Sequence, residues 1–279
     1  MQWTHADREF AYTADDFAAV AALLYQLAGI RLNVSKDAMV YSRLVRRIRT
    51  LQLSGVREYL DYLRQTPEEN EHFINALTTN LTSFFREAHH FDVLAEFLQR
   101  QRCSRIWCAA SSTGEEPYSI AMVVAEHYGR FDVPVEIIAT DIDSQVLKEA
   151  QTGIYNAMKV ERLEPERLRN FFQRGAGSKQ GKVRVCAELR QMVQFERLNL
   201  LDPHWQIPSG LDVIFCRNVM IYFDKQTQLQ LLERMIRLLR PGGIYIAGHS
   251  ENFSHARHLV EPIGRTVYRP SKPGERSGV

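Results

Sequence analysis

The chain has 279 residues, enough for one small and one medium domain, and 45% of its residues are hydrophobic while 24% are charged. This ordinary globular usage excludes a disordered, collagen-like or membrane-embedded chain. The 35 basic and 33 acidic residues nearly cancel, so an acidic partner has to be met by a local basic patch rather than by overall charge.

The N-terminal segment, MQWTHADREF, has no basic stretch followed by an apolar one, and the chain nowhere contains about 18 uninterrupted apolar residues. We therefore expect a cytoplasmic protein that does not insert into a membrane. A helical period then begins at Thr13, which forms a capping box with Asp16, and Gly29 is the expected end of this first helix.

Three more helices are expected before residue 80. Val40, Leu44 and Ile48 mark the second, and apolar residues at helical spacing over 56–63 mark the third. The fourth opens at Thr66-Pro67-Glu68-Glu69 and buries Phe73 and Leu77. Residues 1–80 are therefore predicted to form a small all-helical N-terminal domain.

Residues 81–279 change to alternating strands and helices. After a helix over 87–100, strands are expected at 105–110, 135–141, 211–218 and 244–250, with helices starting near Glu115 and Asp143 and spanning 225–240. Apolar strands that alternate with helices predict a largely parallel sheet covered on both faces. This part of the chain is therefore predicted to be an α/β, doubly wound domain.

The alternation is interrupted at about 174–198 by the glycine-rich loop RGAGSKQG. The flanking segments KVRVCAEL (182–189) and MVQFERL (192–198) have the pattern of short antiparallel strands, so we expect an inserted β-hairpin subdomain. The polar tail SKPGERSGV (271–279) is expected to be frayed.

The four cysteines, Cys103, Cys108, Cys186 and Cys216, show neither a CxxC pair nor a repeated zinc-ligand spacing. We expect buried free thiols and no metal site. A disulfide framework is the alternative, and it is disfavoured in a chain without an export signal.

In an open α/β sheet a ligand lies beyond the carboxyl ends of the strands. The first such end, residues 109–119, has small residues that let a ligand approach, but it lacks GxGxxG, which disfavours a dinucleotide. Glu115 and Glu116 would repel a phosphate, yet they suit a ligand with ammonium and sulfonium groups, such as S-adenosylmethionine. Either glutamate has the alternative role of complementing the helix dipole; we favour Glu116 as the ligand-facing one.

Two further strand ends carry polar groups. Asp141 is placed to accept both ribose hydroxyls, whereas Asp143 suits the N-cap of the following helix. At the third end Arg217 and Asn218 are adjacent, and Asn199 follows the preceding segment; asparagine amides can bind an adenine edge or a carboxylate. A purely structural ion pair is the alternative role of Arg217.

Several motifs in one order resemble the bacterial chemotaxis receptor methyltransferases of the CheR type. They are TNLTSFFRE (79–87), STGEEPYS (112–119), ATDID (139–143), FCRNVMIYFD (215–224) and GGIYIAGHSENF (242–253). The resemblance covers nearly the whole chain. It implies a Rossmann-like class I methyltransferase domain that transfers a methyl group from S-adenosylmethionine to receptor glutamates, giving glutamyl methyl esters and S-adenosylhomocysteine.

The resemblance also implies residue roles. The cofactor pocket would use Asn80, Thr82, Arg86, Glu116, Asp141, Asn199, Leu200, Arg217 and Asn218. Arg86 would also be the essential arginine and Tyr222 the active-site tyrosine. Gly175, Gly177 and Gly181 match relatives that dock on a short aromatic peptide at the C-terminus of the receptor, with an ordinary surface hairpin as the alternative.

A glutamate carboxylate, with an ordinary pKa near 4.3, is already a nucleophile at neutral pH, so no general base is expected. Arg43, Arg46 and Arg47 share one face of the second helix and are predicted to orient an acidic receptor helix; a merely solvated basic face is the alternative. A nucleic-acid methyltransferase is disfavoured because stacked aromatic residues are largely missing among the basic ones. A non-catalytic cofactor-binding module also stays open, and we expect a monomer.

Overall fold

The computed structural model describes residues 8–271, so the predicted frayed tail lies outside the described residues from 272 onwards. The chain divides into two compact units. The helical unit comprises the residues up to Thr79 together with Tyr222–Asp224, and the sheet unit comprises Asn80–Ile221 and the residues from Lys225 onwards.

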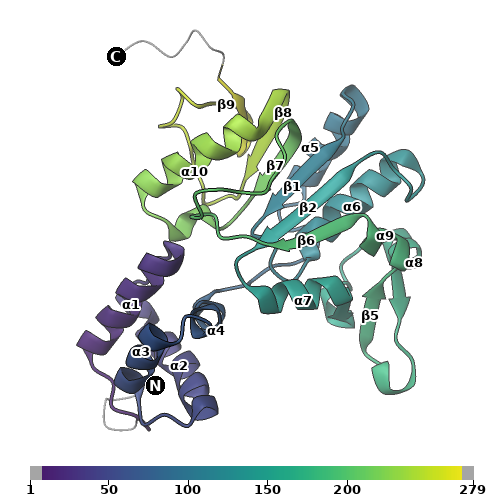
Figure 1. Ribbon diagram of the computed structural model, residues 1–279. Coiled ribbons are helices and arrows are strands. Elements are labelled where there is room, and N and C mark those ends of the chain that lie inside the picture. Colours follow the sequence, from purple (N-terminus) through teal and green to yellow (C-terminus); the bar gives the residue numbers. More distant parts are fainter. Residues whose placement is uncertain (1–7, 272–279) are drawn as a thin grey trace. The chain divides into compact units, whose positions relative to one another are not determined.

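The helical unit contains the four predicted helices and one short 3-10 turn (Figure 1). They are α1 (Ala14–Ala28), η2 (Val34–Lys36), α2 (Asp37–Leu51), α3 (Val56–Gln65) and α4 (Glu69–Leu77). The predicted capping box is confirmed, because the Thr13 side chain accepts the Asp16 N–H and the Asp16 carboxylate accepts the Thr13 N–H. Gly29 ends α1 with a left-handed φ of 67°, which favours glycine.

The sheet unit is built on a seven-stranded sheet with the order β6-β2-β1-β7-β8-β10-β9 (Figure 1). The strands are β1 (Arg105–Ala109), β2 (Glu136–Asp141), β6 (Val193–Arg197), β7 (Leu211–Cys216), β8 (Leu239–Ala247), β9 (Val260–Gly264) and β10 (Val267–Pro270). From β6 to β8 neighbours run parallel, and β10 and β9 add an antiparallel end. The largely parallel sheet is confirmed; β9 and β10 were not predicted.

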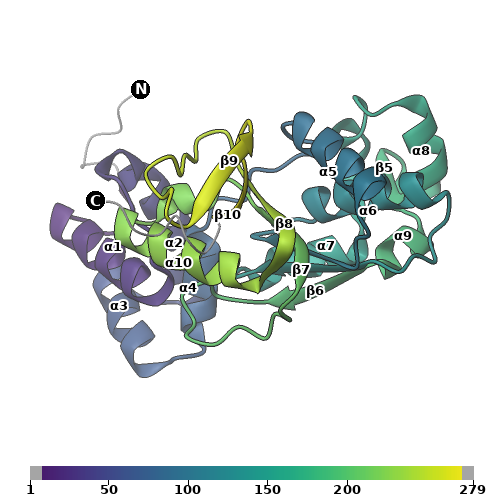
Figure 2. The same cartoon turned by 90° about the horizontal axis from the view of Figure 1, so that it is seen from above.

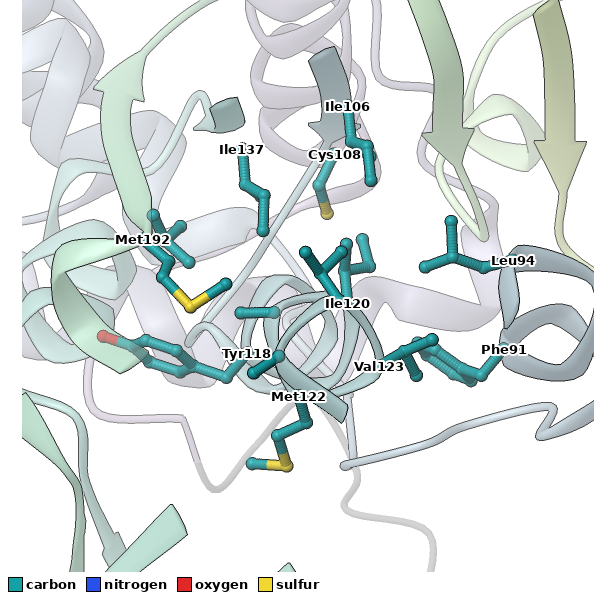
Figure 3. Packing of buried hydrophobic residues seen from close by; sticks show 14 of the residues in the cluster. Phe91, Leu94, Ile106, Cys108, Tyr118, Ile120, Met122, Val123, Ile137 and Met192 are labelled. Carbon is teal, nitrogen blue, oxygen red and sulfur yellow. The ribbon is translucent and has the colours of Figure 1, made fainter. Parts of the chain in front are cut away.

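Helices cover both faces of this sheet. The long ones are α5 (His89–Arg100), α6 (Glu115–Tyr128), α7 (Ser144–Thr152) and α10 (Lys225–Leu238). Figure 2 shows α5 and α6 side by side, and they contact each other directly. Ile106 and Cys108 of β1 point toward Ile120 of α6 in the buried cluster of Figure 3. Trp107, on the opposite face of β1, contacts Trp205, on whose ring Arg234 of α10 stacks.

The inserted antiparallel sheet exists, but its membership differs from the prediction. Its order is β3-β5-β4, formed by β3 (Ile154–Asn156), β5 (Lys182–Val185) and β4 (Phe172–Arg174). Short helical segments accompany it: η3 (Ala157–Lys159), α8 (Pro165–Phe171), η4 (Gly177–Lys179) and α9 (Ala187–Gln191).

The prediction that residues 192–198 form an antiparallel strand of the hairpin is wrong. Val193–Arg197 is β6, which pairs parallel with β2 at the edge of the main sheet. Val193 is buried and Phe195 packs against Tyr118 of α6, while Glu196 and Arg197 are exposed. Apolar and polar residues alternate in this way along the edge strand of either kind of sheet, so the pattern alone did not assign the segment.

Candidate active site

The carboxyl ends of three neighbouring strands meet at one edge of the sheet, because β1 lies between β2 and β7 and all three are parallel. The loop after β1 turns sharply there. Ala110, Ser112 and Gly114 all have left-handed backbones, with φ of 62°, 49° and 95°. Non-glycine residues rarely adopt this conformation, and such strain concentrates at functional sites.

Asp141, at the end of β2, is buried under this loop. Its carboxylate accepts the N–H of Ser112 at 2.8 Å and that of Asp143 at 2.9 Å. Burial raises the pKa of Asp141 to about 6, even though these backbone hydrogen bonds favour the charged form. Asp143 caps α7 by accepting from Gln145 and Val146, as predicted, which leaves Asp141 as the acid available to a ligand.

Asn80 and the segment 198–200 lie beside Asp141. The Asn80 amide donates to Asp143 at 2.9 Å, and the Asn80 carbonyl accepts the Ser112 hydroxyl at 3.1 Å. The Leu198 N–H donates to the Asp141 carbonyl at 2.9 Å, which brings Asn199 and buried Leu200 to the same strand end. The predicted groups on both sides of Asp141 are therefore brought together.

Arg217 is the centre of a buried ion network at the end of β7. Its guanidinium donates to Glu116 at 2.5 Å, lies 3.2 Å from Glu87, and donates to the backbone carbonyl of Arg86. Burial alone would raise the pKa of Glu87, but the Arg217 charge, together with hydrogen bonds from Arg217, Asn218 and the His249 backbone, holds this pKa below its usual value. Arg217 thus combines the predicted place at the strand end with the ion pair considered as its alternative role.

The two glutamates at the start of α6 point to different partners. Glu115 is bound by Lys159 and by the Thr113 hydroxyl. Glu116 reaches Arg217 and accepts from the Cys108 thiol at 3.2 Å. Glu116 is therefore the one that lies among the strand ends.

Glu87 and Glu251 were missed in the sequence analysis. The Asn218 side-chain amide approaches Glu87 at 3.4 Å, and the Asn218 N–H donates to Glu251 at 3.0 Å. Both glutamates lie in motifs of the family resemblance: Glu87 follows Arg86, and Glu251 follows the end of β8. A buried arginine needs an acidic partner, and this need was the signal that could have pointed to them.

Thr82 and Arg86 lie in the loop that precedes α5, and Thr82 is half-buried. One nitrogen of Arg86 donates to the Leu81 carbonyl at 2.8 Å, and its side chain is 35% exposed. Of the lysines and arginines in residues 8–271, Arg217 is the only buried one, whereas buried acids at these strand ends include Glu116, Asp141 and Glu251. The excess of acid fits a cationic ligand and disfavours a phosphate.

Tyr222 groups with the helical unit, whereas Arg86 belongs to the sheet unit. The Arg31 N–H donates to the Tyr222 carbonyl at 2.9 Å, and Tyr25 donates to Asp224 at 2.7 Å, so the segment is anchored on α1 and the residues after it. The joint role of Tyr222 and Arg86 stays a prediction.

The three arginines of α2 differ in their partners. Arg47 binds both carboxylate oxygens of Glu69, and Arg43 donates to the carbonyls of Ala76 and Thr78 at the end of α4. Arg46 is exposed, and none of the ion pairs among the described residues involves it. Arg46 is therefore the most exposed of the three, and the receptor-binding role of Arg43, Arg46 and Arg47 stays a prediction.

The three predicted glycines stand in the β4–β5 connection. A Cβ on Gly175 would lie 2.1 Å from the Lys179 carbonyl oxygen, and Gly177 and Gly181 have left-handed φ of 57° and 80°. The glycines thus permit this tight turn. Because β5 is the central strand, the open edges of the small sheet belong to β3 and β4.

The four cysteines are free and buried, as predicted. Within residues 8–271 no cluster of histidine, cysteine and acidic residues is arranged to hold a metal ion. In the same part of the chain, every helix is too short or too polar to cross a bilayer.

Comparison with known proteins identifies both parts of the chain. The family model described as CheR methyltransferase, SAM binding domain, matches residues 80–269, and that described as CheR methyltransferase, all-alpha domain, matches residues 15–78. Chemotaxis protein methyltransferase 2 of Pseudomonas aeruginosa is 55% identical over 95% of this chain and 96% of its own length. The chemotaxis protein methyltransferase of Salmonella typhimurium is 49% identical over 92% and 90%.

Among solved structures, a TehB-like SAM-dependent methyltransferase from Corynebacterium glutamicum is 12% identical, with a TM-score of 0.38, over 64% of this chain and 87% of that one. The two family models together span nearly all of the described residues. The chain therefore belongs to the CheR methyltransferase family and is an S-adenosylmethionine-dependent methyltransferase of chemotaxis.

Proposed function

We propose that this enzyme methylates glutamate side chains on the cytoplasmic helical region of bacterial chemoreceptors, giving glutamyl methyl esters and S-adenosylhomocysteine. The observation that carries the proposal is the acidic edge of the sheet, where Glu116 and Glu87 pair with the buried Arg217 and the buried Asp141 ends β2. A ligand that carries ammonium and sulfonium groups on an adenosine balances this charge.

The cofactor supplies an electrophilic methyl group on a sulfonium. Asp141 is proposed to accept the ribose hydroxyls, since its two oxygens accept from the Ser112 and Asp143 N–H groups and a carboxylate oxygen can accept more than one hydrogen bond. Asn199 and Leu200 are proposed to flank the adenine. The Arg217 ion network would hold the methionine end of the cofactor. The proposed set of cofactor-binding residues is completed by Asn80, Thr82, Arg86, Glu116, Arg217 and Asn218.

The acceptor glutamate needs no general base, because it is already ionised at neutral pH. Tyr222 and Arg86 are proposed to hold the acceptor carboxylate and the methionine moiety in line, so they contribute chiefly through proximity. The opposite charges of carboxylate and sulfonium partly cancel during transfer, so a pocket that excludes water favours the reaction.

Receptor recognition is proposed to use two surfaces. Arg46 on α2 would orient an acidic receptor helix, and the open edges of the small sheet, next to the Gly175–Gly181 connection, would accept the extended C-terminal peptide of the receptor. We propose that the enzyme works as a cytoplasmic monomer.

The test is methyl transfer from S-adenosylmethionine with a tritiated methyl group to receptor-bearing membranes, with and without the receptor C-terminal peptide as competitor. Base-labile label on the receptor is expected, and Tyr222→Phe and Arg86→Ala should each lower it at least tenfold while circular dichroism shows an intact fold. Near-normal turnover in both variants would refute these two roles. Label in added DNA or RNA instead of receptor would refute the substrate.

A further inference from the structure

Glu251, in the turn after β8, is buried and accepts hydrogen bonds from four backbone N–H groups. They belong to Gly248 at 2.6 Å, Met220 at 2.8 Å, Val219 at 2.9 Å and Asn218 at 3.0 Å. Three of the four donors are consecutive residues of the segment that follows β7. The carboxylate therefore ties the end of β7 to the end of β8.

The arrangement is a nest of backbone donors filled by the protein's own anion. None of the ion pairs within the described residues involves Glu251. Burial disfavours its charged form, whereas the four backbone donors favour it. A buried carboxylate with only backbone partners fixes a backbone conformation, since each donor must stay in place to satisfy it.

The backbone that Glu251 fixes is a strained one. Asn218 has a left-handed φ of 58°, although it is not glycine. Its neighbour across the strand ends is also tightly constrained, because a Cβ on Gly248 would lie 2.4 Å from the Asn218 side-chain nitrogen. The Asn218 amide nitrogen faces Glu87, so the amide oxygen is the atom left to accept from another group.

We propose that Glu251 is a positioning residue for cofactor binding: its carboxylate holds the segment 217–220 in the left-handed turn that sets Arg217 and Asn218 at the pocket. The inference rests on the pocket described under the proposed function. Glu251 itself reaches the ligand only through the backbone it fixes, so its loss should weaken cofactor affinity more than it slows transfer at saturating cofactor.

Glu251→Gln tests this with nearly unchanged shape, because its NH2 group would face N–H donors and cannot accept from them. The Kd of S-adenosylhomocysteine by calorimetry and the KM for S-adenosylmethionine are expected to rise about tenfold, with kcat changed by less than about threefold. Glu261→Gln, which neutralises the half-buried acid paired with Arg269, is the matched control and should change neither.

Three comparisons decide the outcome. A lower melting temperature for Glu251→Gln with an unchanged Kd, measured well below that temperature, would reduce Glu251 to a stability role and overturn the inference. Asp141→Asn reports on the pocket itself: if it weakens binding and Glu251→Gln does not, the pocket stands and the positioning role fails. Gly248→Ala is a second test for the case that Glu251→Gln folds poorly. Its Cβ would lie too close to the Asn218 side chain, so this variant should also raise the Kd of S-adenosylhomocysteine.

Discussion

Each unit of the molecule contains a buried glutamate bound by an arginine, and the two arrangements differ in charge balance. In the helical unit Arg47 forms an ion pair with one acid, Glu69. The neutral Tyr59 hydroxyl also donates to Glu69, at 2.9 Å. In the sheet unit Arg217 meets both Glu116 and Glu87. The balanced pair is complete without a ligand. In the sheet unit the partly exposed Arg86 also lies 4.0 Å from Glu87, but Arg217 is the one buried cation described near the acids Glu87, Glu116 and Asp141, so a cationic ligand can neutralise the remaining buried charge.

The largest effect is expected for Arg217→Met, which leaves two largely buried carboxylates without their cation. Removing one member of a buried pair costs about 3–5 kcal/mol, so urea denaturation should show a loss of this size, and affinity for S-adenosylhomocysteine should disappear. If the folded variant still bound S-adenosylhomocysteine, the acidic residues at the strand ends would bind the cofactor without Arg217.

Arg47→Met is the matched change in the balanced pair. It should destabilise the helical unit by about 1–3 kcal/mol, because Glu69 stays buried beside Tyr59 and loses its charged donor. Cofactor affinity of the folded enzyme should not change. A calorimetric Kd shifted by tenfold would contradict the assignment of this pair to structure.

Asp141 extends the comparison, because it is a buried acid that takes part in none of the ion pairs among residues 8–271. Asp141→Asn should weaken S-adenosylhomocysteine binding about tenfold at pH 7.5, since one ribose hydroxyl loses a charged acceptor. The raised pKa of about 6 sets the pH dependence: wild-type affinity should fall as pH drops through 6, and the variant should respond less.

Stability should follow the opposite sign. The folded pKa of Asp141 lies above its unfolded value, so folding takes up a proton between about pH 6 and pH 4, and this group favours the fold more as the pH falls through that range. Denaturation of wild type and Asp141→Asn at pH 5 and pH 7.5 measures the difference. If the free energy of unfolding changed equally with pH in both proteins, the pH dependence would not come from Asp141.

The smallest effect is expected for Arg46→Glu, a reversal at an exposed position. The KM for receptor membranes should rise a few-fold at low salt, and the difference should fade near 0.5 M salt because exposed charges are screened. Arg64→Glu, another exposed arginine of the helical unit, is the control. Equal responses in both variants would leave α2 without a special role.

The sequence carried most of the fold because helix ends and buried strands have local signals. Thr13, Asp16 and Gly29 delimit α1 through hydrogen bonds within a few residues. The strands β1, β2 and β7 and residues 244–247 of β8 are largely apolar runs. β9 and β10 were not predicted, since Pro262 and Gly264 interrupt β9 and the two short strands together bury only Val260, Val267 and Tyr268, which gives no clear period.

The site was less accessible to sequence reasoning. The role of Asp143 as a helix cap can be predicted from the residues next to it. The partners of Arg217 are Glu87 and Glu116, and no local sequence pattern connects these two residues to β7. Glu251 is harder still, because its partners are backbone groups that carry no sequence signature. Only the tertiary arrangement reveals them.

The nest around Glu251 has a consequence for biosynthesis. The proposed cofactor set begins with Asn80, and the carboxylate that ties the end of β7 to the end of β8 is synthesised 171 residues later, as 251 minus 80 gives. A nascent chain in which β1, β2 and β7 are already synthesised still lacks the Glu251 carboxylate, which accepts hydrogen bonds from the turn after β7. If Glu251 positions the turn after β7 as proposed, cofactor affinity is expected only after residue 251 has been synthesised, and a product truncated before it is expected not to compete with the finished enzyme for the methyl donor.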